Sequence, residues 1–306
     1  TLLLLSLFFA GFGCATTPTS PPSVFEVGID VRTDTQLIDP ATGEDVDWAE
    51  LMRRIDEADI VLLGELHDHA IGHAIQLAVV EDVLDTYKGS AVALEMLERH
   101  EQPLVDDYVE GIIKDSKRFA KLTHSTNWGG WELWYQPIID AAIDRGGRIV
   151  AANAPKQYVT LARKEGFARI DQLPEERRRL VDYPAELSGG RYRERFWEFA
   201  NHGEEEETTI DVSTIDPDDP MLPLYRSQQT WDATMAQSVL NANPTQDQKV
   251  ILLVGQFHVE FDGGIVQELR YRNPDARVFV LSIQREIPED EWQAVPPIAD
   301  LMIVGD

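Results

Sequence analysis

Two segments of the chain share one pattern: an apolar run, a glycine, two further residues and a histidine. VLLGELHDHAIGH at 61–73 has His67 in this position, and VILLVGQFHVEFDGG at 250–264 has His258. The chain contains seven histidines, so two at the same offset behind similar runs indicate a common role. Imidazole groups bind divalent metals and exchange protons near neutral pH. The pattern therefore predicts a site that contains both histidines.

Four other polar residues stand at comparable positions. Glu65, Glu95, Asn153 and Gln256 each end or follow an apolar run. Carboxylates in such places are partly buried, so they must be paired, metal-bound or protonated. Two glutamates and two histidines together could ligate Mn, Co or Zn, or could perform acid–base catalysis.

His69 and His73 lie four residues apart, which places them on one face of a predicted helix. The glutamate of the HExxH zinc motif is absent from this segment, so the spacing alone does not indicate a metal site. We expect these two histidines to lie on the helix surface, where they are solvated or cap the helix.

An aromatic segment, NWGGWELWYQP at 127–137, contains three of the seven tryptophans and a tyrosine. Its spacing fits a helix that buries its aromatic face in the core. It also fits an apolar wall for a flat ligand, with the phenol of Tyr135 as its polar group. Tyrosine is one of the residues that bind haem iron axially. The residues alone leave both interpretations open.

The elements that would position these residues follow the rhythm of an α/β protein. Apolar runs predict buried strands at 59–65, 90–96, 148–155, 249–258 and 276–284. Helical spacing predicts helices at 48–58, 69–88, 99–115, 131–147 and 263–272. A hairpin is expected within 24–48 and an edge strand within 298–306.

This alternation predicts a mostly parallel sheet with helices on both faces. We divide the fold into a first core part at 24–155, a helical subdomain at 156–246 and a second core part at 247–306. The subdomain includes an acidic loop at 203–220. In parallel sheets, ligands bind beyond the carboxyl ends of the strands, and the polar residues named above fall at such ends.

The charge of the chain argues against one class of partner. It has 27 basic and 54 acidic residues, a net charge of −27, which repels the phosphate backbone of nucleic acids. Arg99 and Lys156 are the basic residues close behind the predicted strand ends. There is no GxSxG elbow or phosphate-binding glycine loop, and the single cysteine lies in the leader, so serine, cysteine and nucleotide chemistry lack support.

The first residues are typical of an export signal. A short apolar stretch leads through GFGC into Cys14, and a tether rich in Pro, Ser and Thr follows at 15–23. This order indicates a lipoprotein signal peptide at 1–14 in which Cys14 is lipidated; an ordinary signal peptide before a free cysteine is the alternative. We therefore expect a soluble fold that meets the membrane through a lipid anchor alone.

Taken together, these motifs resemble a known family. LLGELHD, ALEMLERHEQ, WYQPIIDAA, RIVAANAP and GQFHVEFDGG, in this order behind a lipoprotein-like leader, resemble the ChaN-like haem-binding lipoproteins. That family lies in a wider group with erythromycin esterases and the Tiki/TraB metalloproteases, which share the paired GxxH pattern. The resemblance implies a parallel α/β core with a helical subdomain, anchored to the bacterial outer membrane and facing the periplasm. It also implies haem binding in haem or iron uptake, as a homodimer with haem at the interface.

The resemblance also suggests roles for single residues. Tyr135 matches the family's WYQP segment and is the candidate axial ligand of haem iron, with Tyr108 and Tyr158 as alternatives. His67 and His258 match the motif histidines and could bond the haem propionates, ligate a metal, or act as acid and base. Asn153 and Gln256 complete the set of residues that could bind a cofactor. Glu65 and Glu95 match the acidic positions of the wider group.

Three functions therefore compete. The first is a binding protein that holds haem. The second is a metal-dependent or histidine-based hydrolase, of esterase or peptidase type, that uses Glu65, His67, Glu95 and His258. The third is an interaction lipoprotein with a vestigial site.

Overall fold

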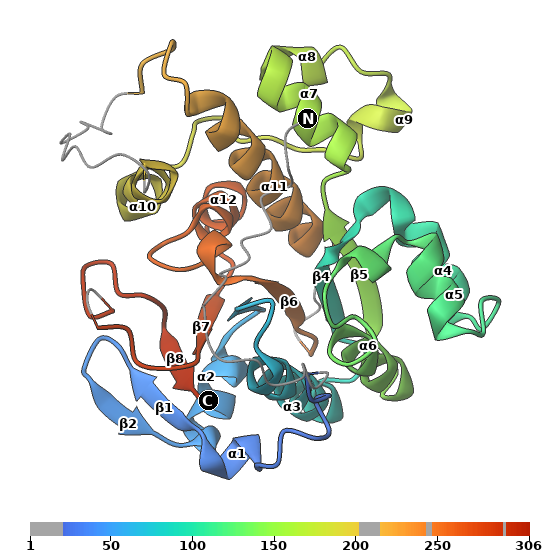
Figure 1. Cartoon of the computed structure of the whole chain (residues 1–306), viewed down its shortest axis with the longest axis vertical. Helices are drawn as coiled ribbons and strands as arrows, with labels where there is room; N and C mark the ends of the chain where they lie inside the picture. Colours follow the sequence, from blue (N-terminus) through green and yellow to red (C-terminus); the bar gives the residue numbers. More distant parts are fainter. Residues whose placement is uncertain (1–20, 202–214, 243–246, 290–291) are drawn as a thin grey trace, which may run out of the picture.

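The computed structural model describes residues 21–201, 215–242, 247–289 and 292–306. Cys14 and most of the predicted acidic loop lie outside the described residues. The strands form one sheet with helices packed on both of its faces (Figure 1). The predicted fold class is confirmed.

The sheet has the strand order β2-β1-β8-β7-β3-β6-β4-β5. From β8 to β5 every neighbouring pair is parallel, whereas β1 runs antiparallel to both β2 and β8. The strand bounds are β1 Gln36–Asp39, β2 Glu44–Val46, β3 Ile60–Glu65, β4 Ala91–Glu98, β5 Arg148–Asn153, β6 Val250–Gly255, β7 Val278–Gln284 and β8 Leu301–Val304.

The central strands are apolar throughout because both of their faces are covered. Val61 and Leu63 of β3 enter one core, which they share with α3 and α6. Ile60 and Leu62 enter the other core, which they share with α11 and α12. Figure 1 shows α11 and α12 above the strands and α3 below them. Side chains alternate along a strand, so a continuous apolar run is required when helices lie on both sides.

The helices vary from single turns to a helix of 20 residues. The α-helix bounds are α1 Val31–Asp34, α2 Trp48–Glu57, α3 Ala70–Thr86, α4 Gln102–Val109, α5 Ser116–Leu122, α6 Tyr135–Asp144, α7 Lys156–Glu165, α8 Phe167–Ile170, α9 Glu175–Arg178, α10 Gly190–Asn201, α11 Leu222–Asn241 and α12 Gly264–Arg272. The short 3₁₀ helices are η1 Arg99–Glu101, η2 Ser125–Asn127 and η3 Gln256–His258.

Two of the predicted helices begin later than expected, for local reasons. The helix expected from residue 99 starts as the turn η1, and α4 then begins with Pro103 in its first turn, where proline is tolerated. The helix expected from residue 131 begins at Tyr135. Gly130 adopts a φ of 71° before it, and any Cβ there would lie 2.1 Å from the Trp134 ring. This turn therefore requires glycine.

The prediction of an edge strand at the end of the chain is wrong in its position. β8 pairs with β7 on one side and with β1 on the other, so it lies inside the sheet. The edge is formed instead by β2 of the predicted N-terminal hairpin. The sequence pattern predicts that a strand forms here. It does not predict the pairing with β1, because the two segments lie far apart in the chain.

The segment predicted as a helical subdomain contains α7 to α11. Two small cores lie in this segment. One joins Val159 and Ala162 of α7 to Ile170 of α8, and the other joins Tyr192 and Phe196 of α10 to Tyr225 of α11. α11 packs on the sheet itself, because Met235 belongs to the same core as β3 and β6. The chain division at residue 156 stays a prediction. In the described part of the chain, no helix is both long and apolar enough to cross a membrane.

Candidate functional site

The two motif histidines meet because their strands are neighbours. β3 and β6 pair in parallel, with Glu65 opposite Gly255 at their carboxyl ends. His67 follows β3 after one intervening residue, and His258 ends the short helix η3 that follows β6. Both histidines therefore lie at the same edge of the sheet, as the repeated pattern predicted.

Glu65 is the buried centre of one half of the site. Its side chain is 1% exposed, and Oε1 lies 2.7 Å from Nδ1 of His67. The Tyr135 hydroxyl donates to Oε1 at 2.6 Å, and the Gln76 amide donates to Oε2 at 2.5 Å. Burial alone would raise the pKa of Glu65, but the neighbouring imidazoles, chiefly that of His73, and these hydrogen bonds lower it to about 2. Glu65 is therefore a carboxylate at neutral pH.

His67 lies at the exposed side of the same group. Its side chain is 44% exposed, and its ring lies 5.1 Å from that of the half-buried Trp128. Partial burial disfavours the charged imidazole, but the hydrogen bond to Glu65 and the charge of Glu95 outweigh this effect and raise the pKa of His67 to about 9. His67 is therefore an imidazolium at neutral pH.

His258 is the centre of the second half, and it is buried. Its Nδ1 lies 2.5 Å from Oδ1 of Asp232, and the Gln228 amide lies 3.0 Å from the same nitrogen. The Tyr192 hydroxyl donates to Oδ2 of Asp232 at 2.5 Å. Burial opposes charge on His258, but Asp232 and Glu95 raise its pKa. The pairing with Asp232 orients the His258 imidazole so that its Nε2 faces Glu95.

Glu95 joins the two halves. Its Oε1 lies 3.7 Å from Nε2 of His258, and its Oε2 accepts a hydrogen bond from the Gly255 amide at 2.7 Å. A Cβ on Gly255 would lie 3.1 Å from Nε2 of His67 and 3.5 Å from Oε2 of Glu95. Gly64 is as constrained, because its Cβ would lie 3.2 Å from Cα of Gln256. Both glycines serve close packing at the strand ends. We call Glu65, His67, Glu95, Asp232 and His258 the strand-end cluster.

The remaining predicted residues occupy supporting positions. Asn153 is buried and donates to the backbone oxygen of Glu95 at 2.9 Å, so it fixes the end of β4. Gln256 begins η3, and its Oε1 is buried without a hydrogen-bond partner.

The three candidate tyrosines differ in position. Tyr135 is fully buried against Glu65, and burial raises its pKa well above 10, so in this arrangement it is a phenol closed to solvent. Tyr108 donates to Asp140 at 2.8 Å, away from the strand-end cluster. Tyr158 packs with the small core around Val159. The role of axial ligand for any of them stays a prediction.

The expectation that His69 and His73 lie on the helix surface is wrong. His73 is fully buried, with Nδ1 2.9 Å from Oε1 of Gln76 and its ring stacked on Trp134 at 4.9 Å. His69 is the N-cap residue of α3, but it is 2% exposed and both of its ring nitrogens lack hydrogen-bond partners. The reason is that α3 is covered on nearly every side, so it has little solvated surface.

Several residues of the site were not predicted. Asp232, Gln228 and Tyr192 come from α10 and α11, where the sequence shows no motif. Gln76 lies one turn after His73, and Trp128 belongs to the aromatic segment already noted. The aromatic segment was an available signal, since one of its two interpretations was an apolar wall for a flat ligand, and Trp128 lies beside His67.

The arrangement gives the divalent-metal alternative no support. Within residues 21–201, 215–242, 247–289 and 292–306, no group of three or more His, Cys, Asp or Glu side chains is placed to hold a metal ion. The cluster carboxylates are instead paired with imidazoles.

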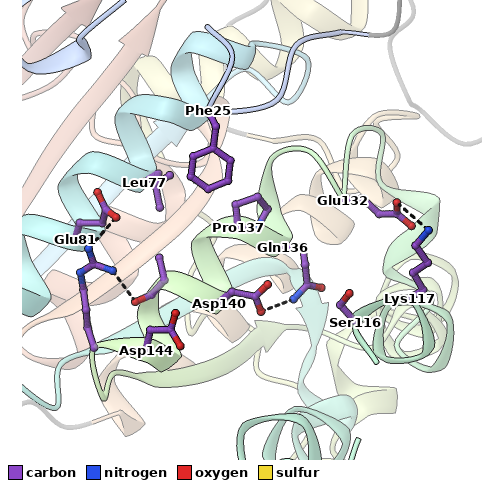
Figure 2. A pocket seen from close by; sticks show the side chains of 12 residues that line it. Phe25, Leu77, Glu81, Ser116, Lys117, Glu132, Gln136, Pro137, Asp140 and Asp144 are labelled. Atoms are coloured by element: carbon purple, nitrogen blue, oxygen red, sulfur yellow. Dashed lines mark hydrogen bonds and ion pairs between the residues drawn. The ribbon is translucent and has the colours of Figure 1, made fainter. Parts of the chain in front are cut away.

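A separate groove of about 470 Å³ lies over α3 and α6, with Phe25 above it (Figure 2). Its floor includes Leu77 and Pro137, and carboxylates such as Asp140 and Asp144 line its side. It adjoins Gln136, the neighbour of Tyr135, but contains no member of the strand-end cluster.

Comparison with known proteins identifies the family. Residues 51–269 match the family model described as haem-binding uptake, Tiki superfamily, ChaN. The match covers more than half of the chain, so the protein belongs to this family, and the predicted resemblance is confirmed. No curated protein matches the chain in sequence.

Two solved structures illustrate what the chain is similar to. One described as cofacial haem binding to ChaN of Campylobacter jejuni has a TM-score of 0.62 and 19% identity, over 90% of this chain and 98% of that one. A mutant of the erythromycin esterase EreC in its open conformation has a TM-score of 0.44 and 15% identity, over 84% of this chain and 78% of that one. At 19% identity, the likeness to the ChaN structure supports the fold alone.

Proposed function

We propose that the protein binds haem at the exposed face of the strand-end cluster, where His67 and Trp128 meet the ligand. The observation that supports this most directly is the exposure of His67. Its side chain is 44% exposed, whereas those of Glu65, Glu95 and His258 are 1%, 9% and 11% exposed. A ligand that arrives from solvent therefore contacts His67 before the rest of the cluster.

The residues at this face suit a haem. Haem combines a flat apolar macrocycle with two propionates and an iron centre. Trp128 offers an aromatic surface beside His67, and aromatic walls suit flat apolar ligands. The His67 imidazolium supplies a positive charge for a propionate in an otherwise acidic chain.

Arg99, one of the two basic residues that the sequence placed behind strand ends, does not serve this purpose. Its guanidinium lies 2.8 Å from Oδ2 of Asp182 and donates to the backbone oxygen of Thr234 at 2.7 Å. Arg99 is thereby committed to holding α11 against the sheet, and within the cluster His67 is the imidazole that is exposed to solvent.

A hemin titration tests the proposal. We expect a saturable change in the Soret band with the full chain and at least a tenfold weaker affinity for His67→Ala, because a charge-assisted hydrogen bond contributes about 1.5–3 kcal/mol. His100→Ala is the matched control, since His100 is 42% exposed but lies outside the strand-end cluster. Equal hemin affinity of His67→Ala and His100→Ala would show that His67 does not contact the haem.

We also propose the cellular setting that the sequence suggests: a lipoprotein anchored through Cys14 to the outer membrane, facing the periplasm, and acting as a homodimer in haem or iron uptake. The family to which the chain belongs supports the uptake role. Membrane fractionation of Cys14→Ser tests the anchor, with release into the soluble fraction as the expected result. Sedimentation with and without hemin tests the dimer, and an unchanged monomer under both conditions would argue against it.

A further inference from the structure

The segment from Val109 to Leu122, which joins α4 to α5 and includes α5, is positively charged in a strongly acidic chain. It contains four basic and two acidic residues, against 27 and 54 in the whole chain. One of its two acidic residues, Asp115, caps α5 by accepting a hydrogen bond from the Arg118 amide at 2.8 Å. We call residues 109–122 the basic tip. Figure 1 shows α4 and α5 at the outer edge of the molecule, beyond β5.

The basic tip presents its charges and several apolar side chains to solvent together. Ile113, Phe119 and Ala120 are buried beneath it. The outer side chains are apolar at Val109, Ile112 and Leu122, which are 38%, 65% and 40% exposed, and basic at four exposed positions, Lys114, Lys117, Arg118 and Lys121.

These basic side chains are largely without partners in the described part of the chain. Lys117 lies 3.9 Å from Glu132, but both side chains are more than half exposed, so the pair contributes little. No ion pair within the described residues involves Lys114, Arg118 or Lys121. The cations are therefore available for an external anion.

We propose that the basic tip binds the surface of an anionic membrane, with Ile112 and Leu122 entering the lipid interface, so that the fold contacts the membrane in addition to the lipid anchor expected from the sequence. A surface that mixes lysines with exposed aliphatic side chains matches the headgroup region of a bilayer, which offers both anionic charge and apolar depth. A nucleic acid offers phosphates and bases but no apolar depth for aliphatic side chains to enter. The rest of the chain is acidic and is repelled by such a membrane, so contact is confined to this segment.

The test is sedimentation of the full chain with lipid vesicles, with Cys14→Ser in every variant so that no lipid is attached. We expect stronger partition into vesicles that contain about a third phosphatidylglycerol than into pure phosphatidylcholine. Substitution of the four basic residues of the tip by glutamine is expected to lower that partition on the order of 100-fold. Each basic residue contributes about 1 kcal/mol to binding at an anionic membrane surface, and screening by salt reduces the total.

A matched variant separates this effect from a general change in charge. This variant also loses four positive charges, but outside the basic tip, through glutamine in place of Lys88, Arg163, Lys164 and Arg177. Its partition into vesicles is expected to stay within about twofold of that of the parent protein. Ile112→Ser with Leu122→Ser lowers binding about tenfold by removing the apolar contribution.

Three results would overturn the proposal: equal partition into the two kinds of vesicle, equal losses in the two glutamine variants, or salt-sensitive binding to nucleic acid without binding to vesicles. The proposal does not depend on haem. Hemin titration of the glutamine variant of the tip, without vesicles, is expected to match that of the parent protein.

Discussion

Glu65→Gln removes a buried negative charge while it keeps the size of the side chain. The carboxylate faces Nδ1 of His67 at 2.7 Å and accepts hydrogen bonds from Tyr135 and Gln76. These contacts lower the pKa of Glu65 from its ordinary 4.5 to about 2, a difference that corresponds to about 3 kcal/mol of stability at neutral pH. The new amide also directs a donor at Gln76 or Tyr135, which leaves a buried polar contact unmade.

The sign of the pH dependence follows from the two pKa values. The pKa of Glu65 is lower in the folded state, so its contribution is present above about pH 4.5 and is lost as the pH falls through about 2. The pKa of His67 is raised to about 9, so its contribution is present below about pH 6.5 and is lost as the pH rises through about 9. The pair is therefore most stabilising between about pH 4.5 and 6.5.

Thermal unfolding and NMR titration measure these effects. At pH 7 we expect Glu65→Gln to lower Tm by about 6 °C, from roughly 2 °C per kcal/mol for a domain of this size. The pKa of the His67 ring should fall from about 9 toward 6.5. Glu132→Gln changes an exposed carboxylate and should alter neither quantity. Glu65 would not stabilise the fold or the charge of His67 if Glu65→Gln and Glu132→Gln unfolded at the same temperature and His67 titrated at the same pH in both.

Three further predictions concern the same cluster. Asp232→Asn lowers the pKa of His258, because the closest anion on its Nδ1 is lost; NMR titration of that ring showing no change would contradict this. Gly255→Ala places a methyl group 3.1 Å from Nε2 of His67, so we expect a loss of about 1–3 kcal/mol in denaturant unfolding and weaker hemin binding. Hemin affinity falls as the pH rises through about 9, because His67 then loses the proton that attracts a propionate; a rise measured by Soret titration would point instead to iron bound by neutral imidazole.

Much of the fold could be predicted from the sequence because the signals were local. The run that forms β3 is apolar at every position, and such a run is required of a strand covered on both faces. Parallel strands bring their carboxyl ends to one edge, so the convergence of Glu65, His67, Glu95 and His258 at that edge could be predicted, whereas the place of β6 between β3 and β4 could not. These predictions needed no knowledge of side-chain packing.

The rest depends on contacts between distant segments. Asp232 approaches His258 across 26 residues of sequence, from a helix without a motif. His69 and His73 were misplaced because one surface of α3 was assumed to face water, whereas Trp134 and other residues cover it. The burial of Tyr135 against Glu65 is equally a result of tertiary packing, 70 residues apart.

The most direct test of the proposed site is an NMR experiment on the full chain with gallium protoporphyrin, a diamagnetic analogue of haem. We expect saturable shifts in the ring signals of His67 and Trp128, with the His100 signal unchanged. Saturable binding that leaves His67 and Trp128 unperturbed would contradict it, because the porphyrin would then bind away from the strand-end cluster.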